Sequence, residues 1–301
     1  MKNKVCSLFS GCGGLDLGFI KAGFEVVWAN DIDSFAIQTY KANIGEHIVH
    51  GDINKIPLNK IPKHDILIAG FPCQPFSIMG NEEGFNDHRG TLFFRICSII
   101  AFHKPQVIVL ENVGRLFTHR KGETFAVIKN NIEKLGYKVY HKILNSSNFG
   151  VPQNRNRIFI ICFRKHKIRF RFPDEQPLKI QLRDILEKNV VKKYYLSEKI
   201  KKTILSDGSG GYYSKPATDL RIARPLCATM GKMHRAGQDN YVTTEFGLRR
   251  LTPRECARLQ GFEDCFNIVV SDQQAYKQFG NSVTVNVAHA VANEINRCLN
   301  E

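Results

Sequence analysis

Residues 4–31, KVCSLFSGCGGLDLGFIKAGFEVVWAND, contain a short apolar run, a glycine-rich turn, a helical pattern and a second apolar run. The pattern predicts a strand at 5–9, a helix at 15–22 and a second strand at 25–29. A strand, a helix and a strand in this order form a βαβ unit, whose two strands lie parallel in one sheet. This stretch therefore predicts an α/β fold.

The same alternation continues as far as residue 163. Strands that alternate with helices form a mostly parallel sheet covered on both faces, and ligands bind at the carboxyl ends of its strands. We therefore expect a Rossmann-like sheet. Further strands are predicted at 66–69, 107–110, 138–144 and 157–163, with a short third strand ending near Asp52, and further helices at 35–42, 92–103 and 125–135.

The pattern changes after residue 163, where the chain becomes basic and rich in Gly, Tyr and Ser. Two stretches, SDGSGGYYS (206–214) and MGKMHRAGQDN (230–240), are typical of loops. Regular structure is predicted again at 253–259 and in a terminal helix at 282–299. We expect a catalytic domain at 1–172, a smaller loop-rich recognition domain at 173–267, and a segment at 268–301 that returns to the catalytic domain.

The formal net charge is +15, and residues 165–235 hold 17 Lys and Arg against 7 Asp and Glu, or +10 of that total. Such a basic block is typical of a polyanion partner such as nucleic acid. A solvated lysine-rich surface is the alternative that the charge alone leaves open.

The cysteines and the apolar segments bound the location of the protein. Nine cysteines, an odd number with no C-x-x-C pair, predict neither a disulfide framework nor a cysteine-rich zinc site, and no other metal site is expected. They favour a reducing cytoplasm. No apolar run has the length of a membrane span, and the N-terminus carries no export signal.

The turn FSGCGG (9–14) lets a ligand approach the backbone at a helix N-terminus. A tight turn without a ligand is the simpler interpretation. The glycine spacing is not G-x-G-x-x-G and no Lys follows, so a dinucleotide or triphosphate is disfavoured. Asp31, after the second strand, is placed to bind ribose hydroxyls, and Asp52 follows the third strand. Together they favour an adenosine-type ligand without a pyrophosphate.

In the stretch GFPCQPFSIMG (70–80), Cys73 lies between Pro72 and Pro75. Free cysteine is often a buried small hydrophobe. The two prolines stiffen the chain and remove two backbone donors, which suits a turn that presents one side chain. The stretch alone does not decide between a buried residue and a reactive thiol.

Six separated stretches, in this order, resemble the motifs of DNA cytosine-5 methyltransferases. They are FSGCGG (9–14), GFPCQ (70–74), ENV (111–113), QNRNR (153–157), RLTPRECARLQGF (250–262) and QFGNSV (278–283). The catalytic half is similar to the bacterial HhaI-like restriction–modification type, notably at GFNDHRGTLFF (84–94) and AYKQFGNSV (275–283). The resemblance covers residues 1–164 and 248–301, and the basic block lies where the family carries its target-recognition domain.

The resemblance implies an enzyme that transfers methyl from S-adenosyl-L-methionine to carbon 5 of cytosine, leaving S-adenosyl-L-homocysteine. It assigns Cys73 as the nucleophile that adds to carbon 6, and Glu111 as the group that protonates the ring. It also implies that Arg155 and Arg157, which alternate at a strand start and so would share one face, steady the base and the catalytic groups. Thiolate formation at Cys73 needs a pKa lowered by its surroundings.

The resemblance further implies a methyl-donor pocket, in which Asn281 and Ser282 would also cap the last helix. The expected cofactor-binding residues are Phe9, Ser10, Gly11, Gly13, Gly14, Leu15, Asp31, Ile32, Asp52, Ile53, Pro72, Leu92, Asn281, Ser282 and Val283.

The implied partner is double-stranded DNA, from which the target cytosine is flipped out, and residues 77–91 would form a mobile loop that closes over it. A cognate restriction endonuclease acting on the same site is expected, and nothing demands more than a monomer. Base readout is predicted in 207–213 and 229–241. The expected DNA-binding residues are Gln74, Ser77, Arg89, Arg224, Arg235 and Gln238.

Three other functions compete. A tRNA cytosine-5 methyltransferase shares the catalytic motifs, but this chain lacks the Cys-Phe-Thr signature of those enzymes. A nucleotide-dependent oxidoreductase on a similar sheet would leave the Pro-Cys-Gln, ENV and QNRNR stretches unexplained. A non-catalytic DNA-binding module would not need Cys73, Glu111, Arg155 and Arg157 together.

Overall fold

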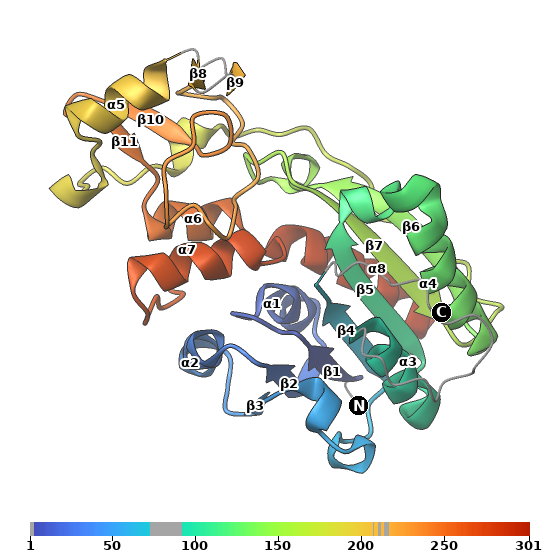
Figure 1. Ribbon diagram of the computed structural model, residues 1–301. Helices are drawn as coiled ribbons and strands as arrows, with labels where there is room; N and C mark the ends of the chain where they lie inside the picture. Colours follow the sequence, from blue (N-terminus) through green and yellow to red (C-terminus); the bar gives the residue numbers. More distant parts are fainter. Residues whose placement is uncertain (1–2, 73–91, 207, 210–211, 214–216) are drawn as a thin grey trace.

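The computed structural model describes residues 3–72, 92–206, 208–209, 212–213 and 217–301. They form a large sheet with helices on both faces and a smaller region of short elements to one side of it (Figure 1). The seven strands run in the order β3-β2-β1-β4-β5-β7-β6. Their bounds are β1 (Lys4–Leu8), β2 (Glu25–Asp31), β3 (Ile48–His50), β4 (Ile66–Gly70), β5 (Val107–Val113), β6 (Lys138–Asn145) and β7 (Asn156–Phe163).

The sheet is mostly parallel, which confirms the expected Rossmann-like fold class. The strands β1 to β5 pair in parallel, and β7 runs antiparallel to both of its neighbours, β5 and β6. The carboxyl ends of β1, β2, β4 and β5 therefore lie at one edge, where a parallel sheet binds its ligands.

Alternating side chains of the inner strands bury both faces of the sheet. Cys6 and Leu67 pack into one core with α3 (Leu92–His103) and α4 (Glu123–Lys134). Val5 and Ile66 pack into a second core with α1 (Gly14–Lys21) and α8 (Val285–Asn300). Strands buried on both faces give continuous apolar runs, which explains the sequence pattern from which they were predicted.

The last helix packs beside the first. A Cβ atom placed on Gly18 of α1 would lie 2.4 Å from Ala288 Cβ of α8, so the two helices meet at a glycine. The helix α2 (Ser34–Asn43) packs against β3. Its N-cap Asp33 accepts hydrogen bonds from the N–H groups of Phe35 and Ala36, which fixes where the helix begins.

A third core lies to one side of the sheet. It joins a set of buried side chains between Leu182 and Val285 with Cys12 of the glycine-rich turn. Residues 230–240 contain no helix or strand, as predicted for a loop. The elements of this region are α5 (Glu198–Leu205), β8 (Gly208–Ser209), β9 (Tyr212–Tyr213), β10 (Tyr241–Thr244), β11 (Gly247–Arg250), α6 (Pro253–Leu259) and α7 (Asp272–Asn281).

The expected terminal helix at 282–299 is wrong at its start. Residues 272–281 form a separate helix, α7, and Ser282 is its extended C-cap rather than an N-cap. Thr284 precedes the first residue of α8. The helix α7 was missed because its sequence, DQQAYKQFGN, is polar and contains Gly280, whose Cβ would lie 2.3 Å from Ala228 N. Gly280 therefore allows α7 to pack closely against the backbone of Cys227 and Ala228.

In the part of the chain that the structure describes, no helix combines the length and apolar character needed to span a bilayer.

Candidate active site

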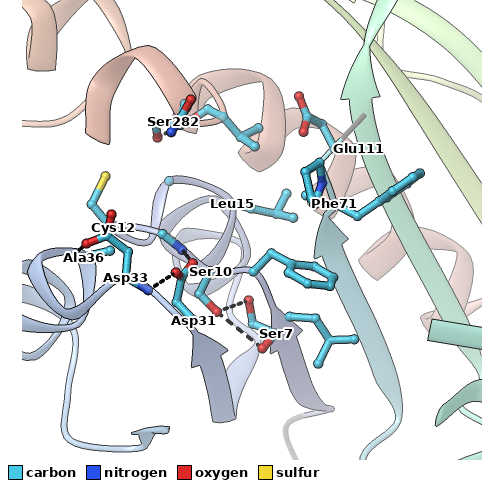
Figure 2. A pocket seen from close by; sticks show the side chains of 18 of the residues that line it. Ser7, Ser10, Cys12, Leu15, Asp31, Asp33, Ala36, Phe71, Glu111 and Ser282 are labelled. Atoms are coloured by element: carbon cyan, nitrogen blue, oxygen red, sulfur yellow. Dashed lines mark hydrogen bonds between the residues drawn. The ribbon is translucent and has the colours of Figure 1, made fainter. Parts of the chain in front are cut away.

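A cavity of about 560 Å³ opens at the carboxyl edge of the sheet. It is lined by residues from the ends of β1, β2, β4 and β5 and from the segment between α7 and α8. Figure 2 shows Asp31 and Glu111 at opposite ends of it, with Ser282 above. One continuous space thus connects the glycine-rich turn with the ENV stretch.

The glycine-rich turn follows β1 and bends sharply before α1. Phe9, Gly11 and Gly13 have left-handed backbones, with φ of 55°, 56° and 91°. A Cβ on Gly14 would lie 2.3 Å from Ser282 Oγ, so only glycine lets this turn meet the segment that closes the cavity. A Cβ on Gly11 would meet no atom within 4 Å. The turn therefore offers open backbone at a helix N-terminus.

Asp31 ends β2 at the wall of the cavity. Its Oδ2 atom accepts a hydrogen bond of 2.8 Å from Gly11 N, and its Oδ1 atom accepts one of 2.8 Å from Asp33 N. Burial raises the pKa of this carboxyl, and the two N–H donors oppose that rise. Because a carboxylate has about four acceptor sites, acceptor capacity remains for ligand hydroxyls.

Apolar groups flank this acid. Ile32 is 67% exposed on the rim, whereas Ile53 is buried beneath Asp52. Asp52 accepts a hydrogen bond from Asn54 N and caps a short 3-10 turn. The open backbone of the turn, the carboxylate acceptor and the apolar rim together fit an adenosine moiety such as that of S-adenosyl-L-methionine.

A buried polar network supports the turn from below. Asp16 accepts hydrogen bonds of 2.9 Å from both Ser7 Oγ and Tyr40 OH. Ser10 Oγ in turn donates to Ser7 Oγ at 2.9 Å (Figure 2). Burial raises the pKa of Asp16 to about 6, although both hydroxyls and the helix N-terminus favour its ionised form. Asp16 and Ser7 were not among the predicted site residues, because each is buried and their meeting depends on tertiary structure.

Glu111, near the end of β5, faces the other end of the cavity. Its Oε1 atom lies 3.1 Å from Arg157 Nε, but among the described residues it accepts no hydrogen bond of good geometry. Burial raises the pKa of Glu111, while the charges of Arg157 and Arg155 lower it. A buried carboxyl oxygen without a donor is suited to receive the amine of a base or to carry a proton.

The side chains of Arg155 and Arg157 do not lie on the same face, contrary to the prediction from the sequence. Arg157 lines the cavity beside Glu111. Arg155 is only 1% exposed, and its guanidinium donates to the carbonyl oxygens of Leu226, Gly280 and Ser282. Arg155 precedes β7, which begins at Asn156, so the period of two does not hold between the two arginines. Arg155 is placed to fix the backbone around the cavity.

Asn112 is a site residue to which no role was assigned from the sequence. Its Nδ2 atom donates a hydrogen bond of 2.8 Å to the carbonyl oxygen of Phe71, and its Oδ1 atom accepts one from Val113 N. It therefore anchors the chain just before Pro72. Its place in the ENV stretch was the only signal for such a role.

Most predicted site residues lie together. Every expected cofactor-binding residue except Gly13 lines the cavity, as do Glu111 and Arg157. A Cβ on Gly13 would lie 2.0 Å from Ile44 Cδ1, which places this glycine against the α2 side of the turn. Cys73, Gln74, Ser77, Arg89 and the expected mobile loop at 77–91 lie outside the described residues.

The other predicted DNA-binding residues lie in the third-core region. Arg224 donates to the carbonyl oxygens of Ala236 and Asp239, and Arg235 pairs with Asp239 at 3.0 Å. Gln238 is exposed. Both guanidinium groups therefore have intramolecular partners, and base readout by these three residues stays a prediction.

The fold is shared with solved methyltransferase structures. The S. pombe Dnmt2 methyltransferase aligns with a TM-score of 0.81 and 20% identity over 100% of both chains. The Entamoeba histolytica methyltransferase EhMeth aligns with a TM-score of 0.79 and 21% identity, again over 100% of both. At this level of identity the likeness shows the fold alone.

Sequence relatives are closer. The Type II methyltransferase M.NlaX of Neisseria lactamica is 42% identical, over 98% of this chain and 97% of its own length. M.HhaI of Haemophilus parahaemolyticus is 38% identical, over 99% and 95%. A family model described as C-5 cytosine-specific DNA methylase matches residues 3–297, nearly the whole chain. Since the match includes both ends of the cavity, the chain belongs to the C-5 cytosine-specific DNA methylase family.

Proposed function

We propose that this protein transfers the methyl group of S-adenosyl-L-methionine to carbon 5 of a cytosine flipped out of double-stranded DNA. One observation carries the proposal. A single cavity joins the turn and Asp31, which suit an adenosine, to Glu111 and Arg157, which suit a pyrimidine. A methyl donor and an acceptor base bound at its two ends would lie next to each other.

The donor end would bind S-adenosyl-L-methionine through the turn, Asp31 and Ser282. When bound, this cofactor supplies an electrophilic methyl group on a sulfonium. The protein would orient it: the Asp31 carboxylate would accept hydrogen bonds from the ribose hydroxyls, the N-terminus of α1 would favour its polar groups, and Ile32 and Ile53 would supply apolar surface for the adenine.

The acceptor end would activate the base. Carbon 5 of cytosine is a poor nucleophile until the Cys73 thiolate forms a bond to carbon 6, with Glu111 giving a proton to the ring nitrogen. Carbon 5 then takes the methyl group, and S-adenosyl-L-homocysteine leaves. Loss of the carbon-5 proton to a base, expulsion of the thiolate and return of the ring-nitrogen proton to Glu111 restore the ring. The raised pKa of Glu111 supports its role as the proton donor.

The basic block would bind the duplex, because Lys and Arg neutralise phosphates and release counterions. We assign target recognition to residues 173–267. Relatives named Type II methyltransferases support a restriction–modification role, with a cognate endonuclease cutting the same site when it is unmethylated. Such an enzyme would act on chromosomal DNA in the cytoplasm of a bacterium.

The test is Cys73→Ser, with Cys265→Ser as the matched control because Cys265 is exposed, lies outside the six motifs and does not line the cavity. Transfer of labelled methyl to duplex DNA should fall below detection in Cys73→Ser and stay at the wild-type rate in Cys265→Ser. A 5-fluorocytosine duplex should form a persistent covalent complex only when Cys73 is present, because carbon 5 carries fluorine in place of the proton whose loss would release the thiolate.

Near-normal methylation by Cys73→Ser would overturn the mechanism. Methylation of tRNA in place of duplex DNA by the wild-type protein would favour the alternative substrate. Bisulfite sequencing of DNA from cells that express the gene would identify the target sequence.

A further inference from the structure

The connection between β5 and α4 is a basic loop next to the active site. Residues 114–122, GRLFTHRKG, follow Glu111 by only a few positions, and here they are called the 114–122 loop. The side chains of Arg115, Arg120 and Lys121 are exposed. In Figure 1, β5 points toward the side of the sheet on which β8 to β11 lie, so the loop emerges on the side of the cavity.

Buried and stacked side chains hold this loop in place. Leu116 is fully buried in the core that contains α3 and α4. The Phe117 ring stacks on His141 with 5.4 Å between centroids and lies 5.2 Å from the Phe125 ring. His119 Nδ1 lies 2.7 Å from Thr124 Oγ1. A cation presented on a fixed platform loses less conformational entropy when it binds an anion.

Arg115 and Lys121 have no charged or hydrogen-bonding partner for their side chains within the described part of the chain. Neither side chain forms an ion pair or hydrogen bond with a described residue. By contrast, Lys129 of α4 and Lys142 of β6 pair with Glu133 and Glu175. Two cations without internal partners, beside paired ones, indicate that an external anion is the partner of this loop.

The position of the loop matches where DNA phosphates must be. Arg115 is four residues beyond Glu111, so their Cα atoms are at most about 13 Å apart along an extended chain. Phosphates recur about every 3.4 Å along each strand of a duplex. If the target cytosine lies against Glu111, phosphates of the same strand lie within reach of Arg115.

We infer that the 114–122 loop is a phosphate-binding surface, on which Arg115 and Lys121 hold the backbone of the DNA strand that carries the target cytosine. The surface is separate from the basic recognition region and closer in sequence to Glu111. It would contribute affinity without sequence preference, since contacts to phosphates position a duplex but carry no base information. The inference rests on the proposed DNA substrate.

The test compares salt dependence of duplex binding between two double variants of equal charge loss. Arg115→Gln/Lys121→Gln alters the loop. Lys60→Gln/Lys63→Gln alters exposed cations outside the basic block, just before β4, whose other end lines the cavity. The dissociation constant of a short mixed-sequence duplex is measured over a series of salt concentrations, with S-adenosyl-L-homocysteine present.

In the loop variant, the logarithm of the dissociation constant for the duplex should rise less steeply with the logarithm of the salt concentration. The slope should be smaller by about 0.9 for each lost phosphate contact, or roughly 1.8 in all. The control should leave the slope unchanged. The dissociation constant of S-adenosyl-L-homocysteine should stay the same in both variants. Arg115→Lys/Lys121→Arg keeps both charges and should keep the wild-type slope.

An unchanged slope in the loop variant, or an equal fall of the slope in the control, would contradict the phosphate-binding surface. If the wild-type protein still methylates duplex DNA, the proposed function would remain supported. A wild-type protein that methylates no duplex DNA would contradict the proposed function, and this surface with it. The altered side chains are exposed, so thermal unfolding of all variants should match the wild type.

Discussion

At the residue scale, Asp16 links the cofactor end of the cavity to the interior. It is fully buried and accepts hydrogen bonds from Ser7 and Tyr40. Ser7 in turn accepts one from Ser10 of the turn. A buried carboxyl favours its neutral form, which is why its pKa rises to about 6. The residue therefore stiffens the turn but reduces stability when it ionises.

The raised pKa of Asp16 predicts a dependence of stability on pH. An aspartate titrates near 3.9 in the unfolded chain and near 6 here, so the folded protein binds more protons between these values. The Asp16 contribution to the free energy of unfolding should therefore fall by about 2 kcal/mol as pH rises from about 4 to about 6. Urea unfolding of wild type and Asp16→Asn over this range measures it as the difference between the two.

Asp264→Asn is the control with the opposite sign. The exposed Asp264 carboxylate pairs with Arg258, and this lowers its pKa. Its contribution to stability should be present above the unfolded pKa and be lost as pH falls through the folded one. A difference between wild type and Asp16→Asn that stays constant from pH 4 to 6 would contradict the assignment.

At the scale of elements, the pair α1 and α8 positions both the turn and the segment that closes the cavity. The turn leads into α1, and residues 282–284 lead into α8, so the contact between these helices sets the distance across the donor end. Gly18 allows that contact, because a Cβ there would lie 2.4 Å from Ala288 Cβ and 2.7 Å from His289 N.

Gly18→Ala should therefore destabilise the protein, although alanine is the better helix former. Overpacking costs about 1–3 kcal/mol and the gain in helix propensity is at most about 1 kcal/mol. Gly114→Ala is the matched control, since its Cβ would lie 3.4 Å from the nearest atom. Urea unfolding should show a lower free energy for Gly18→Ala only. Equal stability of the two variants would show that α8 moves away without cost.

At the scale of the whole molecule, Arg155 and Gln153 join the sheet to the third-core region. Arg155 donates to Leu226, Gly280 and Ser282, while Gln153 donates to Leu259 O and accepts from Leu226 N. These bonds tie the third-core region and the cavity wall to the segment that leads into β7.

Arg155→Lys should lower the free energy of unfolding by about 2–5 kcal/mol, because a lysine cannot reach three carbonyls and each charged hydrogen bond contributes about 1.5–3 kcal/mol. Arg157→Lys should instead lower kcat and leave the free energy of unfolding nearly unchanged. Urea unfolding and kcat measured on both variants make the comparison. If Arg155→Lys kept its stability and lost only kcat, Arg155 would act on the base, as the family resemblance implies.

The third-core region was the least predictable part of the molecule from sequence. The helices α5 and α7 and the hairpin β10–β11 were not predicted, because each is short and none contains a long apolar run. The bonds that Arg224 and Arg235 make to Ala236, Asp239 and neighbouring carbonyls were also hidden. In such a region, tertiary contacts decide the local structure more than propensity does.

The sequence by itself determined the α/β fold and most of the cavity lining. The strands are buried on both faces, and the glycine-rich turn, Asp31 and Glu111 all follow or end such strands, so their approach is dictated by the parallel sheet. Only the tertiary structure decided the separate positions and contacts of Arg155 and Arg157. The carbonyl partners of Arg155 are 71, 125 and 127 residues away, and no local pattern reports contacts of that range.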